Sequence, residues 1–282
     1  MQTLQLFNGA LSEPLGSTAP TIVFVHANGY PPASYRLLLE PLAAWATVYT
    51  VEHRPLWDDK PAPERFHWRG YAEDLTATLE RAALGPVWLL GHSMGAATSM
   101  LLAEQRPDLV AGLIAIDPVL LPSRLYWISR LLSIFNKNTL PIVKRALGRP
   151  HDFQSYEAAF SFYRSKRVFQ RLSDAALLDY VHAGHKVVPG HGVTLRWSGA
   201  WEACVYRSAP LIWSVLKKLK LPMLGIAGDE SDVLSAPIVD KWQAAVKQLS
   251  LHVLHGGHLI PLEQPERCAA LIEDFILGQK VA

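Results

Sequence analysis

The 282-residue sequence has little cysteine, little net charge and no long apolar run. Its two cysteines, Cys204 and Cys268, indicate neither a disulfide scaffold nor a cysteine-rich metal site, which favours a reducing compartment and predicts a cytoplasmic location. A net charge of +2 gives no signature of nucleic-acid binding. No run of about eighteen apolar residues occurs, so no transmembrane helix is expected. Residues 1–20 also lack the basic and apolar regions of a secretory signal.

Hydrophobic residues are abundant instead. They make up 50% of the chain, which is enough for the core of one large domain. Short apolar runs predict strands, and stretches with helical spacing fall between them. The predicted strands are 21–25, 47–51, 87–90, 112–116, 221–227 and 251–254, and the predicted helices are 71–84, 96–105, 237–247 and 265–277. This alternation predicts an α/β fold with a mostly parallel central sheet and helices on both faces.

The alternation stops between residues 118 and 210, where the pattern predicts helices without strands. We therefore expect a core formed by residues 1–117 and 211–282, with an inserted α-helical cap at 118–210. The cap carries 13 Lys and Arg against 5 Asp and Glu, a charge of +8, and the rest of the chain carries −6. A solvated cationic face is the preferred explanation. Attraction of an anionic substrate or an acidic membrane surface is the alternative.

Aromatic residues are frequent in and near this insertion. We expect most of them to form the core of the cap and some to line an apolar ligand pocket. They are Tyr126, Trp127, Phe135, Phe160, Phe162, Tyr163, Trp197, Trp201 and Trp213. An amphipathic helix with Leu125, Ile128, Leu132 and Phe135 on one face begins the insertion.

The most informative motif is the G-x-S-x-G sequence Gly91-His92-Ser93-Met94-Gly95. It joins a predicted strand to a predicted helix, so that the serine would lie at a tight corner. Glycines two residues on either side let neighbouring backbones pass close to it. The first amides of the helix can face a developing negative charge. The motif is typical of a nucleophilic serine, although a simple turn of small residues has the same pattern.

A nucleophilic serine needs a base within hydrogen-bond reach. Among eleven histidines, His258 has the most suitable context, because it follows Gly256-Gly257 in a loop between the last strand and the last helix. Such a loop reaches the carboxyl edge of the sheet, where ligands of open α/β sheets bind. His255 is the local competitor, but its place at the strand end favours a structural role.

The base needs an acid to orient it, and the chain order Ser, acid, His places that acid between the two. Asp232 is our choice, because it lies deep in the loop after the penultimate strand and is followed by apolar residues that could bury it. In the same loop, Asp229 is the reserve candidate, while Asp229 and Glu230 read first as solvated turn residues. Asp117, which follows an earlier strand, is a further alternative, although a turn role before Pro118 is preferred.

A tetrahedral intermediate also needs amide donors for its oxyanion. The residue after the serine, Met94, supplies one backbone N–H. The loop His26-Ala27-Asn28-Gly29 after the first strand should supply the second. Asn28 is the preferred donor and Ala27 the reserve, although Asn-Gly is also common in ordinary turns.

Together, these blocks resemble the serine hydrolases of the α/β-hydrolase superfamily. The four blocks are 25–29, 91–95, 228–234 and 257–266; they follow the order of the family and span nearly the whole chain. The resemblance implies Ser93 as nucleophile, His258 as base, Asp232 as acid and a cap inserted after the strand that ends at Asp117. The chain departs from many members at His26-Ala27, where they have His-Gly, and this departure leaves the second amide donor open.

We therefore expect a carboxylic ester hydrolase, esterase- or lipase-like, that acts on small-molecule esters of apolar acyl or aryl groups and needs no cofactor or metal. The same three residues are compatible with thioester, C–C bond and perhydrolase chemistry. A non-catalytic protein that holds a ligand in a capped pocket is the alternative from another class. Membrane contact is the weaker expectation, no nucleic acid is expected as a partner, and nothing in the sequence indicates the oligomeric state.

Overall fold

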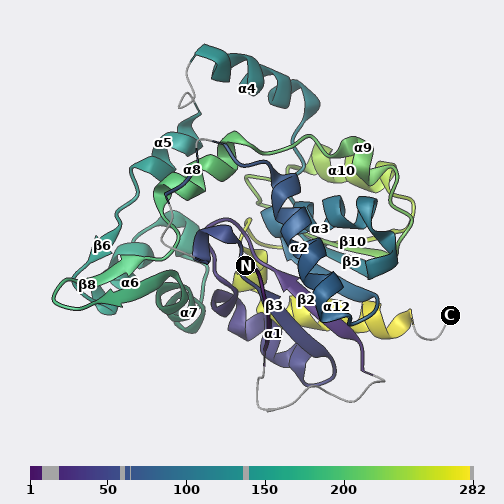
Figure 1. Ribbon diagram of the computed structural model, residues 1–282, viewed down its shortest axis with the longest axis horizontal. Coiled ribbons are helices and arrows are strands. Elements are labelled where there is room, and N and C mark those ends of the chain that lie inside the picture. Colours follow the sequence, from purple (N-terminus) through teal and green to yellow (C-terminus); the bar gives the residue numbers. More distant parts are fainter. Residues whose placement is uncertain (8–18, 58–60, 64, 136–139, 280–282) are drawn as a thin grey trace.

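The computed structural model describes residues 1–7, 19–57, 61–63, 65–135 and 140–279. Within these residues, seven strands form one sheet in the order β1-β3-β2-β4-β5-β9-β10 (Figure 1). Only β1 is antiparallel, at the edge beside β3. The strands are β1 Leu4–Leu6, β2 Thr21–Val25, β3 Thr47–Val51, β4 Val87–His92, β5 Val110–Ile116, β9 Met223–Gly228 and β10 Leu249–Leu254. The mostly parallel sheet that the sequence predicts is thus confirmed.

Helices cover both faces of this sheet, as the apolar runs of its strands require. Along β2, Val23 and Val25 face one buried cluster while Ile22 and Phe24 face the other, because successive side chains of a strand point to opposite faces. The first cluster includes residues of α2 Trp68–Ala82, α3 Met94–Gln105, α9 Trp213–Leu216 and α10 Ala236–Ala245. The second includes residues of α1 Arg36–Ala43, α11 Ile260–Glu263 and α12 Pro265–Gly278.

The segment between β5 and β9 differs from its prediction in one respect. It contains the expected helices, but it also contains a three-stranded antiparallel sheet in the order β6-β8-β7. The hairpin β7–β8 turns through Pro189-Gly190-His191, and Gly190 has a φ of 78°. The helices are α4 Ser123–Phe135, α5 Pro141–Leu147, α6 Tyr156–Arg164, α7 Asp174–Gly184 and α8 Gly199–Arg207; the strands are β6 Asp152–Phe153, β7 His185–Val188 and β8 Gly192–Leu195.

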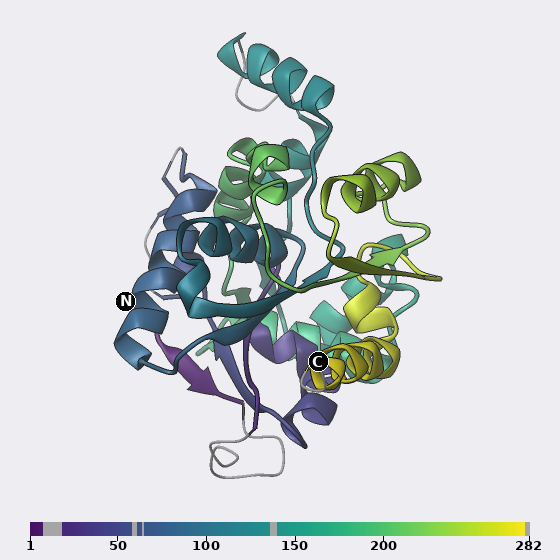
Figure 2. The same cartoon turned by 90° about the vertical axis from the view of Figure 1, so that its right-hand side faces the viewer.

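Most of this insertion packs directly onto the sheet. Leu177 and Tyr180 of α7 belong to the buried cluster that contains Phe24, and Trp197 and Trp201 belong to the opposite cluster. Two described helices differ. Val143 and Ala146 of α5 form a small separate cluster with Ala203 of α8, and α4 projects away from the rest of the molecule in both views (Figures 1 and 2). Much of the described insertion therefore shares the core of the sheet, whereas α4 and α5 do not.

The aromatic residues of the insertion divide as expected, with one correction. Trp197, Trp201 and Trp213 are buried. Tyr126, Phe162 and Tyr163 line a cavity described below. Trp127 is 64% exposed and does not line that cavity, so it belongs to neither of the two expected groups. The side chains of Leu132, Ile134 and Phe135 lie outside the described residues.

Candidate active site

Ser93 lies at the sharp corner between β4 and α3 that its motif predicts. Its backbone has φ 56° and ψ −114°, a strained conformation for a residue with a side chain. The two glycines leave room for the neighbouring backbone: a Cβ on Gly95 would overlap the carbonyl of Val25, and one on Gly91 would overlap Ala96. The sequence thus gives this corner its shape, which projects the serine from the carboxyl edge of the sheet.

His258 is in hydrogen-bond contact with Ser93, with 2.9 Å between its Nε2 and the serine Oγ. Its other ring nitrogen, Nδ1, lies 2.7 Å from Oδ1 of Asp117. A carboxylate only accepts, so Nδ1 carries the proton and Nε2 is left to accept from the serine hydroxyl. Ser93, His258 and Asp117 therefore form the hydrogen-bonded series that activates a serine.

The acid in this series is Asp117, and the prediction of Asp232 is corrected. Asp117 directly follows β5, is fully buried and has a φ of 41°. Besides His258, its carboxylate accepts the hydroxyl of Ser231 at 2.6 Å and the backbone N–H of Gly228 at 2.9 Å. These three donors stabilise the negative charge away from water. The turn residue before Pro118 is thus the residue that orients the base.

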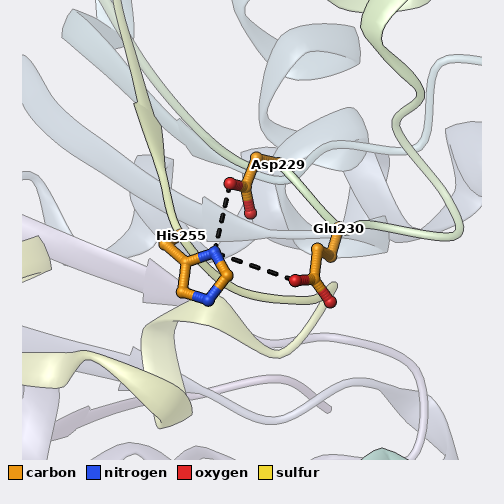
Figure 3. Close-up of side chains that lie close together, drawn as sticks. All are labelled: Asp229, Glu230 and His255. Carbon is orange, nitrogen blue, oxygen red and sulfur yellow. Dashed lines mark hydrogen bonds and ion pairs between the residues drawn. The ribbon is translucent and has the colours of Figure 1, made fainter.

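Asp232 lines the cavity near the serine, but its side chain is exposed rather than buried by the apolar residues that follow it. Its neighbours Asp229 and Glu230 lie in an exposed group with His255 (Figure 3). There His255 Nδ1 is 3.2 Å from Asp229 and 3.8 Å from Glu230. Asp229 and Glu230 are thus exposed, as the sequence favours, and Asp229 is not bonded to His258. His255, for which the sequence favours a structural role, is instead exposed. This exposed group is the one three-residue arrangement with metal-ligand spacing in the described parts of the chain.

The loop after β2 brings Asn28 and Ala27 to the same cavity as Ser93 and Met94. The Ala27 N–H lies 3.4 Å from the hydroxyl of Tyr35, whereas the Asn28 N–H has no acceptor among the described residues. The buried His26 holds this loop: its Nδ1 donates to Ala27 O at 2.7 Å, and its Nε2 accepts the N–H of His53 at 3.2 Å. Burial lowers the pKa of His26 to about 4, so the ring is neutral and suited to both bonds.

A cavity of about 1040 Å³ opens over Ser93. Its wall is largely apolar and includes Leu121, Leu125, Phe162, Val168, Phe169 and Ile238. Among the described residues it also holds six cationic side chains against two carboxylates. The cations are Arg65, Arg130, Arg145, Arg149, Lys166 and Arg207, and the carboxylates are Glu202 and Asp232. Arg149 is paired with Glu202 at 2.9 Å.

Comparison with known families agrees with this fold and geometry. Residues 22–271 match the sequence profile of the alpha/beta hydrolase family. The chain belongs to the alpha/beta hydrolase family. This hydrolase is 32% identical to the 2-(acetamidomethylene)succinate hydrolase of Mesorhizobium japonicum over 92% of its own length and 88% of the relative. A crystal structure of E-2-(acetamidomethylene)succinate hydrolase superposes with a TM-score of 0.78 at 24% identity, covering 92% of each chain.

A shorter match, 35% identical, links this hydrolase to an sn-1-specific diacylglycerol lipase of Mus musculus. It covers 36% of this chain and 33% of that protein. No helix in the described parts of the hydrolase is both long enough and apolar enough to cross a membrane.

One further residue of this hydrolase supports the site and escaped the sequence analysis. His92, inside the serine motif, accepts the hydroxyl of Tyr35 at 2.7 Å on Nδ1 and donates from Nε2 to the backbone carbonyl of His258 at 2.9 Å. Burial keeps the pKa of His92 well below 6.5, so its ring stays neutral. Because Tyr35 also accepts from Ala27, a single buried chain of hydrogen bonds joins the Asn28 loop to the His258 loop. The signal was present in the motif itself, but its partners are distant in sequence.

Proposed function

We propose that this alpha/beta hydrolase cleaves carboxylic esters through an acyl-enzyme formed on Ser93. The observation that carries the proposal is the bonded series Ser93–His258–Asp117 at the floor of a large, mostly apolar cavity. In the first step His258 Nε2 takes the serine proton while Oγ attacks the ester carbonyl. His258 then returns the proton to the leaving alcohol, and a water molecule repeats the sequence to release the acid.

The backbone N–H groups of Met94 and Asn28 are the proposed donors to the oxyanion. Met94 is the first residue of α3, where amides lack a partner within the helix. Among the described residues, the Asn28 N–H has no acceptor while the Ala27 N–H is bonded to Tyr35, which supports Asn28 over Ala27. Each such donor contributes on the order of 3 kcal/mol to transition-state stabilisation.

The substrate that best fits the cavity is an ester with a sizeable apolar acyl or aryl group. A second candidate is a carbonyl substrate that also carries a carboxylate. The excess of cationic side chains in the wall favours it. So does the relative that acts on a succinate derivative. Thioester, C–C bond and perhydrolase reactions use the same three residues and have no separate observation in their favour.

The experiment that tests the mechanism compares the wild type with Ser93→Ala on a chain-length series of p-nitrophenyl esters. We expect kcat/KM to fall by at least about a thousandfold, because no other group replaces the nucleophile. Ser235→Ala removes a serine that lines the same cavity and serves as the matched control. Substantial hydrolysis by a folded Ser93→Ala protein would contradict the serine mechanism.

Two further measurements separate the alternatives. A fluorophosphonate should label the wild type but not Ser93→Ala; absence of labelling in the wild type would favour a ligand-binding protein. Pairs of p-nitrophenyl esters, one with a terminal carboxylate and one with a terminal methyl group, test the second candidate. Preference for the carboxylate, weakened by added salt, would support an anionic substrate.

A further inference from the structure

The outward face of α4 is strongly apolar, although none of the residues that the structure describes covers it. Trp127 is 64% exposed, Ile128 50% and Leu131 60%. With Arg124 they have the spacing of one helical face. Both views show α4 standing clear of the neighbouring elements (Figures 1 and 2). Isolated exposed apolar residues are common, but a contiguous apolar face marks an interaction site.

The opposite side of α4 belongs to the cavity. Tyr126 and Arg130 line the cavity over Ser93, and so does Leu125 at the edge between the two faces. The helix therefore has one face toward the proposed catalytic cavity and another toward solvent. A partner bound to the outer face of α4 would therefore lie next to the cavity.

The charge of the residues around α4 indicates which kind of partner would bind its outer face. Residues 118–151 contain six Lys and Arg and no Asp or Glu. Of these, Arg130, Arg145 and Arg149 line the cavity, and Arg149 is paired with Glu202. Arg124, on α4 itself, and Lys144, on the adjoining α5, are exposed. A second copy of the same segment would bring like charges together, which opposes self-association. An anionic surface complements both the charge and the apolar side chains.

The length of α4 determines how the helix would lie in a lipid bilayer. Thirteen residues span about 20 Å, less than the roughly 30 Å of a bilayer core. An amphipathic helix of this kind lies in the plane of the interface, with its apolar side chains among the acyl chains and its basic side chains at the headgroups.

We propose that α4 docks this protein onto an anionic lipid surface through Trp127, Ile128 and Leu131, and thereby places the cavity over Ser93 at that surface. Acyl esters dissolved in the lipid would then enter beside Leu125 and Tyr126. This delivery of substrate rests on the proposed ester hydrolysis, whereas the docking itself does not.

The test measures binding of the Ser93→Ala protein, which cannot consume lipid, to phosphatidylcholine vesicles with and without phosphatidylglycerol. We expect binding to the anionic vesicles only, decreasing with salt. The triple variant Trp127→Ser/Ile128→Ser/Leu131→Ser should weaken it at least about tenfold, because it removes three inserted side chains. Val187→Ser and Val253→Ser, which alter exposed apolar residues on β7 and β10, are the matched controls.

A spectroscopic measurement locates the contact. Brominated lipids should quench the fluorescence of Trp127, and Trp127→Phe should lose that quenching while it still binds. Failure to bind anionic vesicles, or equal binding by the triple variant, would overturn the proposal. A dimer that dissociates in the triple variant would overturn it in favour of a contact between two copies.

Activity measurements keep the two proposals apart. The triple variant should hydrolyse a short, water-soluble ester at the wild-type rate, since its three residues do not line the cavity. It should lose activity only on esters presented in anionic vesicles. Binding without hydrolysis would contradict the proposed function alone, and hydrolysis without binding would contradict the docking alone.

Discussion

Two groups of polar side chains lie near His258, and they differ in burial and in hydrogen bonding. The inner group, His92 and Asp117, is buried and hydrogen-bonded to elements that are distant in sequence. The outer group, Asp229, Glu230 and His255, is exposed at the ends of β9 and β10. Both groups offer the residue types that a serine mechanism needs. Only the inner one is held in the geometry that the mechanism requires.

Under the proposed mechanism, burial and hydrogen bonding, rather than residue type or chain order, distinguish the carboxylate that orients His258 from those that do not. Three donors hold the carboxylate of Asp117. Asp232 is exposed to water, which screens its charge and leaves its orientation free. A carboxylate can fix the tautomer of a histidine only when it is itself fixed.

The largest expected effect follows from exchanging the two carboxylates for amides. Asp117→Asn should reduce kcat/KM by about 10³- to 10⁴-fold, because an amide does not hold the Nδ1–H tautomer of His258. Asp232→Asn should change it by no more than about threefold. Steady-state hydrolysis of a p-nitrophenyl ester, with circular dichroism to verify folding, measures both. A larger loss of kcat/KM in Asp232→Asn than in Asp117→Asn would instead assign the role of the acid to Asp232.

A smaller effect distinguishes the buried histidine from the exposed one. His92→Leu should lower kcat about tenfold with little change in KM, because the His258 carbonyl and the Tyr35 hydroxyl lose their partner. His92→Gln retains a donor for that carbonyl and should recover part of the loss. His255→Gln should stay within about twofold of the wild type.

The pH profile of kcat/KM tests whether His92 acts by positioning the loop that carries His258. If His92 positions the base loop, its replacement should shift the acid limb of the profile, which reports the base of the free enzyme. A variant that merely lost stability would keep the profile of the wild type. Equal effects of the His92 and His255 variants would remove the distinction between the inner and outer groups.

These expectations also show which parts of the site a sequence can predict. The sequence predicts the serine corner and His258 because their signals are local: glycines flank Ser93 on both sides and precede His258, and each residue adjoins a well-marked strand. The strands 21–25 and 47–51 were found with the bounds that the structure has, since fully buried parallel strands are continuous apolar runs.

The acid could not be found in the same way. The sequence favours a turn role for Asp117, because Asp-Pro is a common turn. What makes it functional is a left-handed backbone conformation and donors at 228 and 231, more than a hundred residues away. The hairpin of the insertion was missed for a different reason. Its strands are only four residues long, and they follow a helical segment that dominates the periodicity.

The smallest expected effect concerns the stability of the buried histidines. Burial lowers the pKa of His53 well below 6.5, and neither of its ring nitrogens has a hydrogen-bond partner in the described parts of the chain. Between pH 6.5 and about 4, the unfolded chain binds protons on His53 and His26 that the folded chain does not, so the free energy of unfolding decreases as the pH falls.

His53→Leu removes one of these protons without removing a ring hydrogen bond. It should flatten the decrease by about 1 kcal/mol per pH unit in that window. Urea unfolding at pH 7 and at pH 5 measures the change. An unaltered pH dependence in the variant would mean that the buried histidines do not govern acid sensitivity.

The hydroxyl and amide that hold Asp117 have a consequence for biosynthesis. The ribosome completes Ser93 and Asp117 within the first 117 residues, but Ser231, Gly228 and His258 emerge more than a hundred residues later. Asp117 therefore lacks the partners that hold its carboxylate until β9 has docked beside β5. Under the proposed mechanism, Ser93 therefore becomes a nucleophile only after the last third of the protein has folded onto the first.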